Sequence, residues 1–214
     1  PAPTPAEYPG PVPSAGDPAG VAELLARFGV PTTGATVCRT PDEAAAAAIA
    51  FPAVVKIAAA EHRTELGGVR LGLPDAGAVR AAAAELLTAT DAVLVQRQLT
   101  GTEVVVGGFR DPSFGPVVMV GLGGIWVEAL ADVAFALAPL SVEEAADLIG
   151  SLRGYRVLSG GRGRPAVDLA ALARVVVAAG DLLAAVPRVA ALDLNPVLAT
   201  PDDVVAVDWK ITTS

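Results

Sequence analysis

The residues best suited to chemistry lie near the C-terminus, in the segment AALDLNPVLATPDDVVAVDWK from Ala190 to Lys210. Two apolar, β-rich stretches flank the turn-like run Thr200–Asp203, and this pattern predicts a β-hairpin. A turn made of those four residues sets three cross-strand pairs: Ala199 with Val204, Asn195 with Asp208, and Asp193 with Lys210.

Alternation along these strands separates apolar from polar side chains. We expect one face to carry Leu192, Leu194, Leu198, Val205, Val207 and Trp209. The other face is expected to carry Asp193, Asn195, Asp208 and Lys210. Carboxylate and amide oxygens are ligands that Mg²⁺ favours, so the hairpin is a candidate metal site. The alternative is a solvated polar face with a weak Asp193–Lys210 pair, although Pro196 inside the strand counts against it.

A second candidate region surrounds Lys56, which lies in the strand-like stretch PAVVKIA. An ammonium group in a β-branched strand must find an anion or water, so we favour a binding role over a lysine at a sheet edge. The segment EHRTELGGVRLG follows and contains His62, the chain's single histidine, and the pair Gly67–Gly68. His62 is a candidate for proton or phosphoryl transfer, and the glycines for close approach to a phosphate; a surface histidine and an ordinary turn are the alternatives.

Two further segments could contact phosphate groups. In FGPVVMVGLGGIWVE, the glycines Gly121, Gly123 and Gly124 interrupt an apolar strand and precede Glu128, which indicates an anion-binding loop. RGYRVLSGGRGRP, from Arg153 to Pro165, holds four arginines. We read that segment as a solvated loop, with contact to a CoA or phosphate group as the alternative.

Composition narrows the classes of partner. The net charge of −8 argues against nucleic acid or an anionic membrane as the main partner. We find no secretory signal pattern, and the longest uncharged stretch, 112–127, is too short and too rich in glycine for a membrane helix. A single cysteine cannot form an internal disulfide, so we expect a soluble protein of the cytoplasm.

The elements that must position these residues alternate without a strict βαβ order, which predicts an α+β fold with mostly antiparallel pairing. Residues 1–17 are rich in proline and predict a linker or tail. The predicted helices are Val21–Phe28, Asp42–Ala50, Ala76–Leu87, Ser141–Ile149 and Val167–Val186. The predicted strands before the hairpin are Ala53–Ile57, Val69–Leu73, Ala92–Gln96, Glu103–Phe109, Pro116–Val120 and Val133–Leu137.

Taken in order, the motifs resemble the ATP-grasp (β-type) part of ADP-forming acyl-CoA synthetases, with succinyl-CoA synthetase β chains as distant relatives. The resemblance covers residues 18–212 and rests on VVK, HRTELGGVRLGL, VLVQ, FRDPSFGPVVMVGLGGIWVE, DVAFALAPL, RGYRVLSGGRGRP, LDLNPVLATPD and VAVDWKI. It implies two α+β lobes with the nucleotide held between them. The lobes are expected at 18–95 and 96–214, with helix 18–30 packing on the second lobe.

The resemblance also implies a reaction in which acyl-CoA, ADP and phosphate are converted reversibly to an acid, CoA and ATP. A phosphohistidine carries the phosphoryl group, and an α-type CoA-binding subunit or fused domain provides its main site. The implied roles place Lys56 on nucleotide phosphates, Val95 and Gln96 at adenine, and Glu103 toward the nucleotide. The resemblance implies that Asn195 and Asp208 bind Mg²⁺, with Asp193 in support. Three further parts complete the implied site. Gly67 and Gly68 approach the phosphates, the Gly123–Gly124 loop with Glu128 lines the phosphoryl-transfer end, and His62 relays phosphate.

One departure concerns the loop before His62, where this chain reads IAAAE and the family usually has a longer loop with Ser-Pro-Asp. The shortening leaves open whether His62 reaches the relay position. Two other readings therefore stand beside the enzyme: a non-catalytic ATP-grasp module that binds nucleotide, and a structural subunit that binds none. The acid used and the choice between adenine and guanine are not set by these residues.

Overall fold

A computed structural model describes residues 2–14, 16–58, 67–124, 132–161, 163 and 165–213 of the 214-residue chain. Contacts within the chain group it into two compact units. Unit 1 comprises 1–15, 20–32 and 100–214, and unit 2 comprises 16–19 and 33–99.

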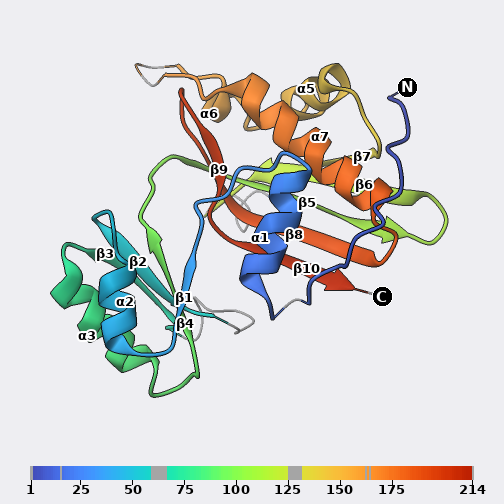
Figure 1. The fold of residues 1–214 in the computed structure, drawn as a ribbon. Helices are drawn as coiled ribbons and strands as arrows, with labels where there is room; N and C mark the ends of the chain where they lie inside the picture. Colours follow the sequence, from blue (N-terminus) through green and yellow to red (C-terminus); the bar gives the residue numbers. More distant parts are fainter. Residues whose placement is uncertain are drawn as a thin grey trace. The chain divides into compact units, whose positions relative to one another are not determined.

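Unit 1 is built on a six-stranded sheet in the order β10-β8-β5-β6-β7, with β9 pairing to β8 (Figure 1). Its strands are β5 (Thr102–Asp111), β6 (Gly115–Leu122), β7 (Val133–Leu137), β8 (Val189–Ala199), β9 (Val204–Ala206) and β10 (Trp209–Thr213). Its helices are α1 (Pro18–Arg27), α5 (Val142–Gly150), α6 (Tyr155–Leu158) and α7 (Leu169–Ala185). Neighbouring strands are antiparallel, as the sequence predicted.

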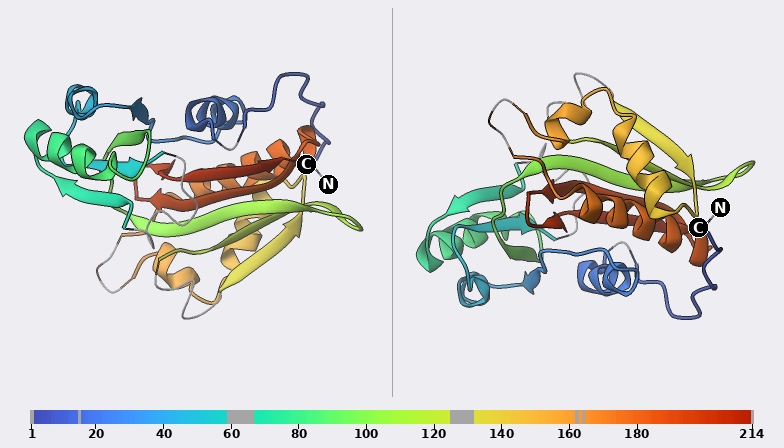
Figure 2. Two further views of the ribbon diagram at one scale, coloured as in Figure 1. Left: turned by 90° about the horizontal axis from the view of Figure 1, so that it is seen from below. Right: turned by 90° about the horizontal axis from the view of Figure 1, so that it is seen from above.

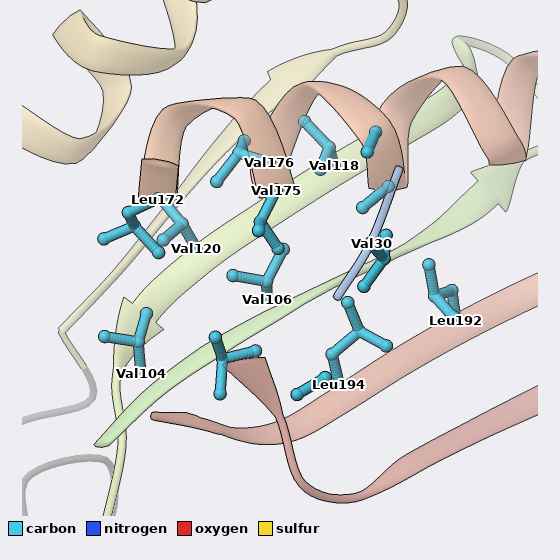
Figure 3. Packing of buried hydrophobic residues seen from close by; sticks show 14 of the residues in the cluster. Val30, Val104, Val106, Val118, Val120, Leu172, Val175, Val176, Leu192 and Leu194 are labelled. Atoms are coloured by element: carbon cyan, nitrogen blue, oxygen red, sulfur yellow. The ribbon is translucent and has the colours of Figure 1, made fainter. Parts of the chain in front are cut away.

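The core of unit 1 lies between one face of this sheet and helix α7. Valines of β5 and β6 point toward Leu172, Val175 and Val176 on the helix (Figure 3). Close packing depends on Gly108, because a Cβ there would overlap the Val117 carbonyl oxygen and lie 2.6 Å from Leu183 Cδ1. Helices α1, α5 and α6 add side chains to the same core. Helices α5 and α7 thus cover one face of the unit 1 sheet (Figure 2), and its candidate site residues must be sought on the other face.

The N-terminal residues 2–14 form no helix or strand, yet one of them is fixed to unit 1. The Tyr8 N–H donates to the Ala185 carbonyl oxygen at 2.8 Å, and the Tyr8 ring meets Phe28 edge to face at 6.1 Å. The single large side chain among the prolines thus packs beside α1, whose Val21, Leu24 and Leu25 belong to the core of unit 1.

Unit 2 has a four-stranded sheet in the order β1-β4-β2-β3. Its strands are β1 (Thr36–Cys38), β2 (Ala53–Ile57), β3 (Val69–Leu73) and β4 (Val93–Arg97), and its helices are α2 (Pro41–Ala47) and α3 (Ala76–Leu86). Small side chains of α2 and α3 pack with Cys38, Val55 and Val95 in a second core. Thr40 caps α2 and Asp75 caps α3, each side chain accepting a backbone N–H of the first turn. Among the described residues, no helix combines the length and apolarity that crossing a bilayer requires.

Candidate functional site

The C-terminal hairpin has the register predicted from the sequence. Ala199 pairs with Val204, and Asp193 pairs with Lys210. Between those pairs, the Asn195 N–H donates to the Asp208 carbonyl oxygen at 3.1 Å. The strand arrangement therefore brings the two carboxylates, the amide and the ammonium onto neighbouring positions of one hairpin.

The predicted apolar face of the hairpin is wrong beyond its midpoint. A β-bulge places Asn195 and Pro196 of β8 opposite Val105, because the pairing with β5 shifts between Val104 and Val106. The extra residue reverses the alternation, so the side of the core changes along both strands of the hairpin. The residues in the core are Leu192, Leu194, Val197, Ala199, Val204, Ala206, Trp209 and Ile211. Leu198 and Val205 lie outside that core, and Val207 is half-buried.

The bulge leaves Asp193, Asn195 and Asp208 beside a change in strand direction rather than on a regular polar strand. Partial desolvation raises the pKa of Asp193, the charge of Asp208 raises it further, and Lys210 opposes both. Asp208 Oδ1 also accepts the Trp209 N–H at 2.9 Å. Two carboxylates close enough to repel each other, with an amide nearby, form an oxygen-rich set that a divalent cation would neutralise.

Asp193, Asn195 and Asp208 are too few to supply every ligand of a metal ion. Within the described ranges, no group of three or more His, Cys, Asp or Glu side chains could hold an ion. Mg²⁺ commonly takes one or two carboxylates and fills its other positions with water and substrate phosphates. The hairpin residues fit that mode of binding and do not fit a dedicated structural metal site.

Glu103 lies next to Gly121–Gly124, here called the glycine segment, at one end of β5 and β6. The Gly123 N–H donates to the Glu103 carbonyl oxygen at 2.7 Å, and a Cβ on Gly123 would lie 2.8 Å from the Glu103 carbonyl carbon. Gly124 has φ +62°, and a Cβ there would lie 2.6 Å from Glu103 Oε2. Glycine is required at both positions, since backbone and carboxylate occupy the space of any side chain. Glu128 lies outside the described residues.

Asp132 is a buried carboxylate near Gly121 that the sequence did not single out. Its side chain is 4% exposed and accepts the N–H groups of Arg153 at 3.0 Å and Gly154 at 2.7 Å. Burial by itself raises the pKa of Asp132, but these hydrogen bonds and the Arg153 charge outweigh it and leave the pKa lowered. A Cβ on Gly121 would lie 2.8 Å from the Asp132 carbonyl oxygen, so the residue that holds the 153–154 turn also borders Gly121. A lone Asp before an apolar strand was the only signal in the sequence.

The arginine-rich segment is partly helical rather than a simple loop. Residues Tyr155–Leu158 form α6, and Leu158 is fully buried. The Arg153 guanidinium pairs with Asp132 at 3.7 Å, while Arg162 and Arg164 lie outside the described residues. The prediction of a solvated loop is therefore wrong for 155–158, because Leu158 anchors that turn in the core.

In unit 2, Lys56 and Gln96 share the sheet face that points away from α2 and α3. Their neighbours Val55 and Val95 belong to the core, so alternation directs Lys56 and Gln96 to the other side. Both are buried, at 5% and 7% exposure, and Gln96 Nε2 donates to Thr33 Oγ1 at 2.8 Å. A buried amide or ammonium needs hydrogen-bonding or charged partners. Lys56 and Gln96 are therefore candidates for contact with a polar ligand on this face.

A cavity of about 380 Å³ opens beside the end of β4. It is lined by residues 33–36, 47–50 and 95–97, all within unit 2. The volume falls in the range of about 300–1,000 Å³ that is typical of small-molecule sites. Thr33 was missed in the sequence, where nothing in PTTGAT distinguishes it from an ordinary loop residue.

The remaining candidates of unit 2 border residues 59–66. Gly67 has φ +63°, and the Ile57 N–H donates to the Gly68 carbonyl oxygen at 2.9 Å. The glycine pair thus returns the chain to β3 beside Lys56. His62 lies outside the described residues.

Comparison with known proteins gives a consistent result. The model of the ATP-grasp domain family matches residues 16–213. The β subunit of acetate–CoA ligase (ADP-forming) I from Pyrococcus furiosus is 37% identical over 203 residues, which cover 88% of each chain. Acetate–CoA ligase (ADP-forming) I from Archaeoglobus fulgidus is 33% identical over 202 residues, which cover 88% of this chain and 29% of that protein. The chain thus matches most of the length of the Pyrococcus furiosus subunit and spans less than a third of the Archaeoglobus fulgidus protein.

Solved structures give the same answer for the fold. Acetyl-coenzyme A synthetase 1 from Ca. Korarchaeum cryptofilum, in complex with coenzyme A and Ca-AMPCP, superposes with a TM-score of 0.85. It is 34% identical, and the match covers 90% of each chain. A second complex of that protein, with coenzyme A and Mg-AMPPCP, has a TM-score of 0.79 at 34% identity over 89% of this chain and 88% of the other. In that complex the phosphohistidine segment points towards the nucleotide-binding site.

These matches confirm the α+β ATP-grasp fold and the resemblance drawn from the sequence motifs. The antiparallel sheets and the buried Lys56 agree with that assignment. The chain belongs to the ATP-grasp family and groups with the β subunits of ADP-forming acyl-CoA ligases.

Proposed function

We propose that this chain is the nucleotide-binding part of an ADP-forming acyl-CoA ligase. It would transfer a phosphoryl group between a phosphohistidine and ADP, within the reaction acyl-CoA + ADP + phosphate = acid + CoA + ATP. The observation that supports this most directly is the oxygen-rich hairpin of Asp193, Asn195 and Asp208 in a chain whose relatives are ligases of this kind.

The residues divide the work of phosphoryl transfer. Lys56 would hold nucleotide phosphates, and the β4 backbone at Val95 and Gln96, beside the cavity, would receive the adenine. Asp193, Asn195 and Asp208 would bind Mg²⁺, which supplies charge neutralisation at the phosphates. Alignment and charge neutralisation are what this reaction chiefly demands of a protein.

The glycine segment would form the transfer end of the site. Gly123 and Gly124 pack against Glu103 and have no side chains, so a phosphate would approach the backbone of this segment closely. Glu103 is exposed and free of any need to fill a core, consistent with a place toward the nucleotide. Gly67 and Gly68 would approach the phosphates, and His62 and Glu128 would act in the transfer itself.

The proposed reaction also needs CoA binding and a phosphohistidine, which a partner would supply. CoA binding and the main phosphohistidine would belong to an α-type subunit or fused domain, as the name "subunit beta" of one relative and the greater length of the other support. The reading as a non-catalytic module is less favoured, because the named relatives are ligases. Cys38, the chain's one cysteine, is buried and forms no disulfide. The cytoplasm remains our proposal for the location of the protein.

Calorimetric titration with ADP and ATP, with and without Mg²⁺, tests the proposal. Asp208→Asn removes a charge while keeping an oxygen for the Trp209 N–H. At an effective dielectric constant of about 20, a charge pair 4 Å apart is worth about 4 kcal/mol, and partial exposure reduces this to about 2–3 kcal/mol. We expect Mg-dependent nucleotide binding that weakens roughly 30- to 150-fold in Asp208→Asn.

Asp202→Asn is the matched control, since Asp202 is exposed in the turn of the same hairpin. Its affinity should equal that of the wild type. Equal binding by both variants would remove the metal assignment. Mg-dependent binding without exchange of phosphate from a partner's phosphohistidine would instead favour the non-catalytic module.

A further inference from the structure

The sheet face of unit 1 opposite the helices carries an apolar patch at its outer end. It spans three adjacent strands, because Phe109 pairs with Val117, Val117 with Leu137, and Met119 with Phe135. Directly paired residues share a face, and their neighbours Val118 and Val120 point into the core. We call Phe109, Val117, Met119, Phe135 and Leu137 the outer patch.

Three of the five residues of the outer patch are exposed large hydrophobics, whereas Val117 is 9% exposed and Met119 is half-buried. Phe109 is 41%, Phe135 52% and Leu137 57% exposed. Four of the chain's five phenylalanines are exposed; two of them lie in the outer patch, on strands of the sheet, whereas Phe51 and Phe114 lie outside the strands. Contiguous apolar patches on a sheet face, with an edge strand such as β7 beside them, are typical of interaction surfaces.

The same sheet face carries the candidate metal ligands. Asp193 pairs with Gly107, and Gly107 pairs with Met119, so Asp193 and the patch lie in one cross-strand row. With neighbouring strands about 4.8 Å apart, Met119 lies roughly 10 Å from Asp193 and Phe135 roughly 14 Å. A protein seated on the outer patch would therefore lie within reach of the groups that would hold the Mg-nucleotide.

We infer that the outer patch is the docking surface for the α-type, phosphohistidine-bearing portion of the ligase. The inference rests on the proposed function, which needs such a portion to bring its phosphohistidine to the nucleotide. Related chains occur both as a separate β subunit and as 29% of a longer polypeptide, so a chain of this kind works beside further protein. An apolar surface that shares a cross-strand row with the candidate metal ligand Asp193 suits a partner that must remain attached while one segment moves.

A second copy of this chain is the competing occupant. With a net charge of −8 on each copy, self-association would bring two like-charged proteins together, and charge repulsion opposes it. A different partner need not carry that charge.

The test uses the full chain with the α-type portion produced as a separate polypeptide. In the double variant Phe135→Thr/Leu137→Thr, threonine retains β propensity and the side chains replaced are more than half exposed. Removing two central apolar contacts should weaken the association at least about 30-fold, or about 2 kcal/mol. Leu71→Thr is the matched control, because Leu71 is 65% exposed in β3, an edge strand of the other sheet.

Sedimentation velocity and calorimetry would measure association, and Mg-nucleotide titration of each variant would run in parallel. Weaker association in the double variant alone, with unchanged nucleotide binding, supports the docking surface. Unchanged association, loss of self-association instead, or no association of the wild type would each overturn it. Patch-dependent association in a chain that binds no nucleotide would retain the docking surface while contradicting the proposed function.

Discussion

Asp132 offers the sharpest test of how the loop beside the glycine segment is held. The substitution Asp132→Ala removes the acceptor of two backbone hydrogen bonds and one partner of the Arg153 ion pair. The carboxylate is 4% exposed, so water can replace little of what is lost. The substitution should therefore destabilise unit 1 without altering its core.

The magnitude follows from these contacts. Hydrogen bonds to charged groups are each worth about 1.5–3 kcal/mol, so two of them at the lower value amount to about 3 kcal/mol. The Arg153 side chain is 75% exposed, so its ion pair adds little. We expect a loss of about 3 kcal/mol for Asp132→Ala and about half of that for Asp132→Asn, which keeps one acceptor oxygen.

Differential scanning calorimetry and urea unfolding would measure the loss. For a chain of this size, 3 kcal/mol corresponds to a fall in Tm of roughly 6–12 °C. Asp202→Ala, in an exposed turn, should change stability by less than about 0.5 kcal/mol. If Asp132→Ala behaved like that control, the two N–H groups would not depend on the carboxylate, and the reasoning would fail.

The same residue gives a prediction for pH. Because the folded-state pKa of Asp132 is lowered, its contribution is fully present above the unfolded value of about 3.9 and is lost as pH falls through the folded value. The stability difference between wild type and Asp132→Ala should therefore be constant near neutral pH and shrink below about pH 4. A difference that stayed constant down to pH 2 would contradict the lowered pKa.

Two further predictions concern Lys56 and the packing of α7. Lys56→Gln keeps most of the side-chain length but removes the charge, so nucleotide affinity measured by calorimetry should fall about tenfold or more; unchanged affinity would exclude a phosphate contact. Gly108→Ala should cost about 3 kcal/mol in urea unfolding, because its Cβ would overlap the Val117 carbonyl oxygen, which cannot move aside. Gly150→Ala, at the end of α5, is the control: its Cβ would meet nothing within 4 Å, and the gain in helix propensity should leave stability within about 1 kcal/mol of the wild type.

Local pattern was sufficient wherever a single segment decided the structure. The strands Ala53–Ile57, Val69–Leu73 and Val133–Leu137 have the bounds predicted from their apolar runs, since Gly and Pro punctuate the chain around them. The register of the C-terminal hairpin followed from the length of its turn. The short strand Thr36–Cys38 and the helix Tyr155–Leu158 were missed, because each has too few residues to show a period.

The sequence by itself determined the family and the order of most elements, and it supplied the residues proposed to bind Mg²⁺ and phosphate. It could not determine which hairpin residues face the core, because the reversal at Asn195–Pro196 arises from pairing with Val105 on a strand about ninety residues away in the chain. Nor could it reveal the role of Asp132, whose partners Arg153 and Gly154 lie 21 and 22 residues further along the chain. Side-chain period and turn chemistry are local and can be read along the chain, whereas bulges, buried acceptors and uncovered sheet faces depend on contacts between distant segments.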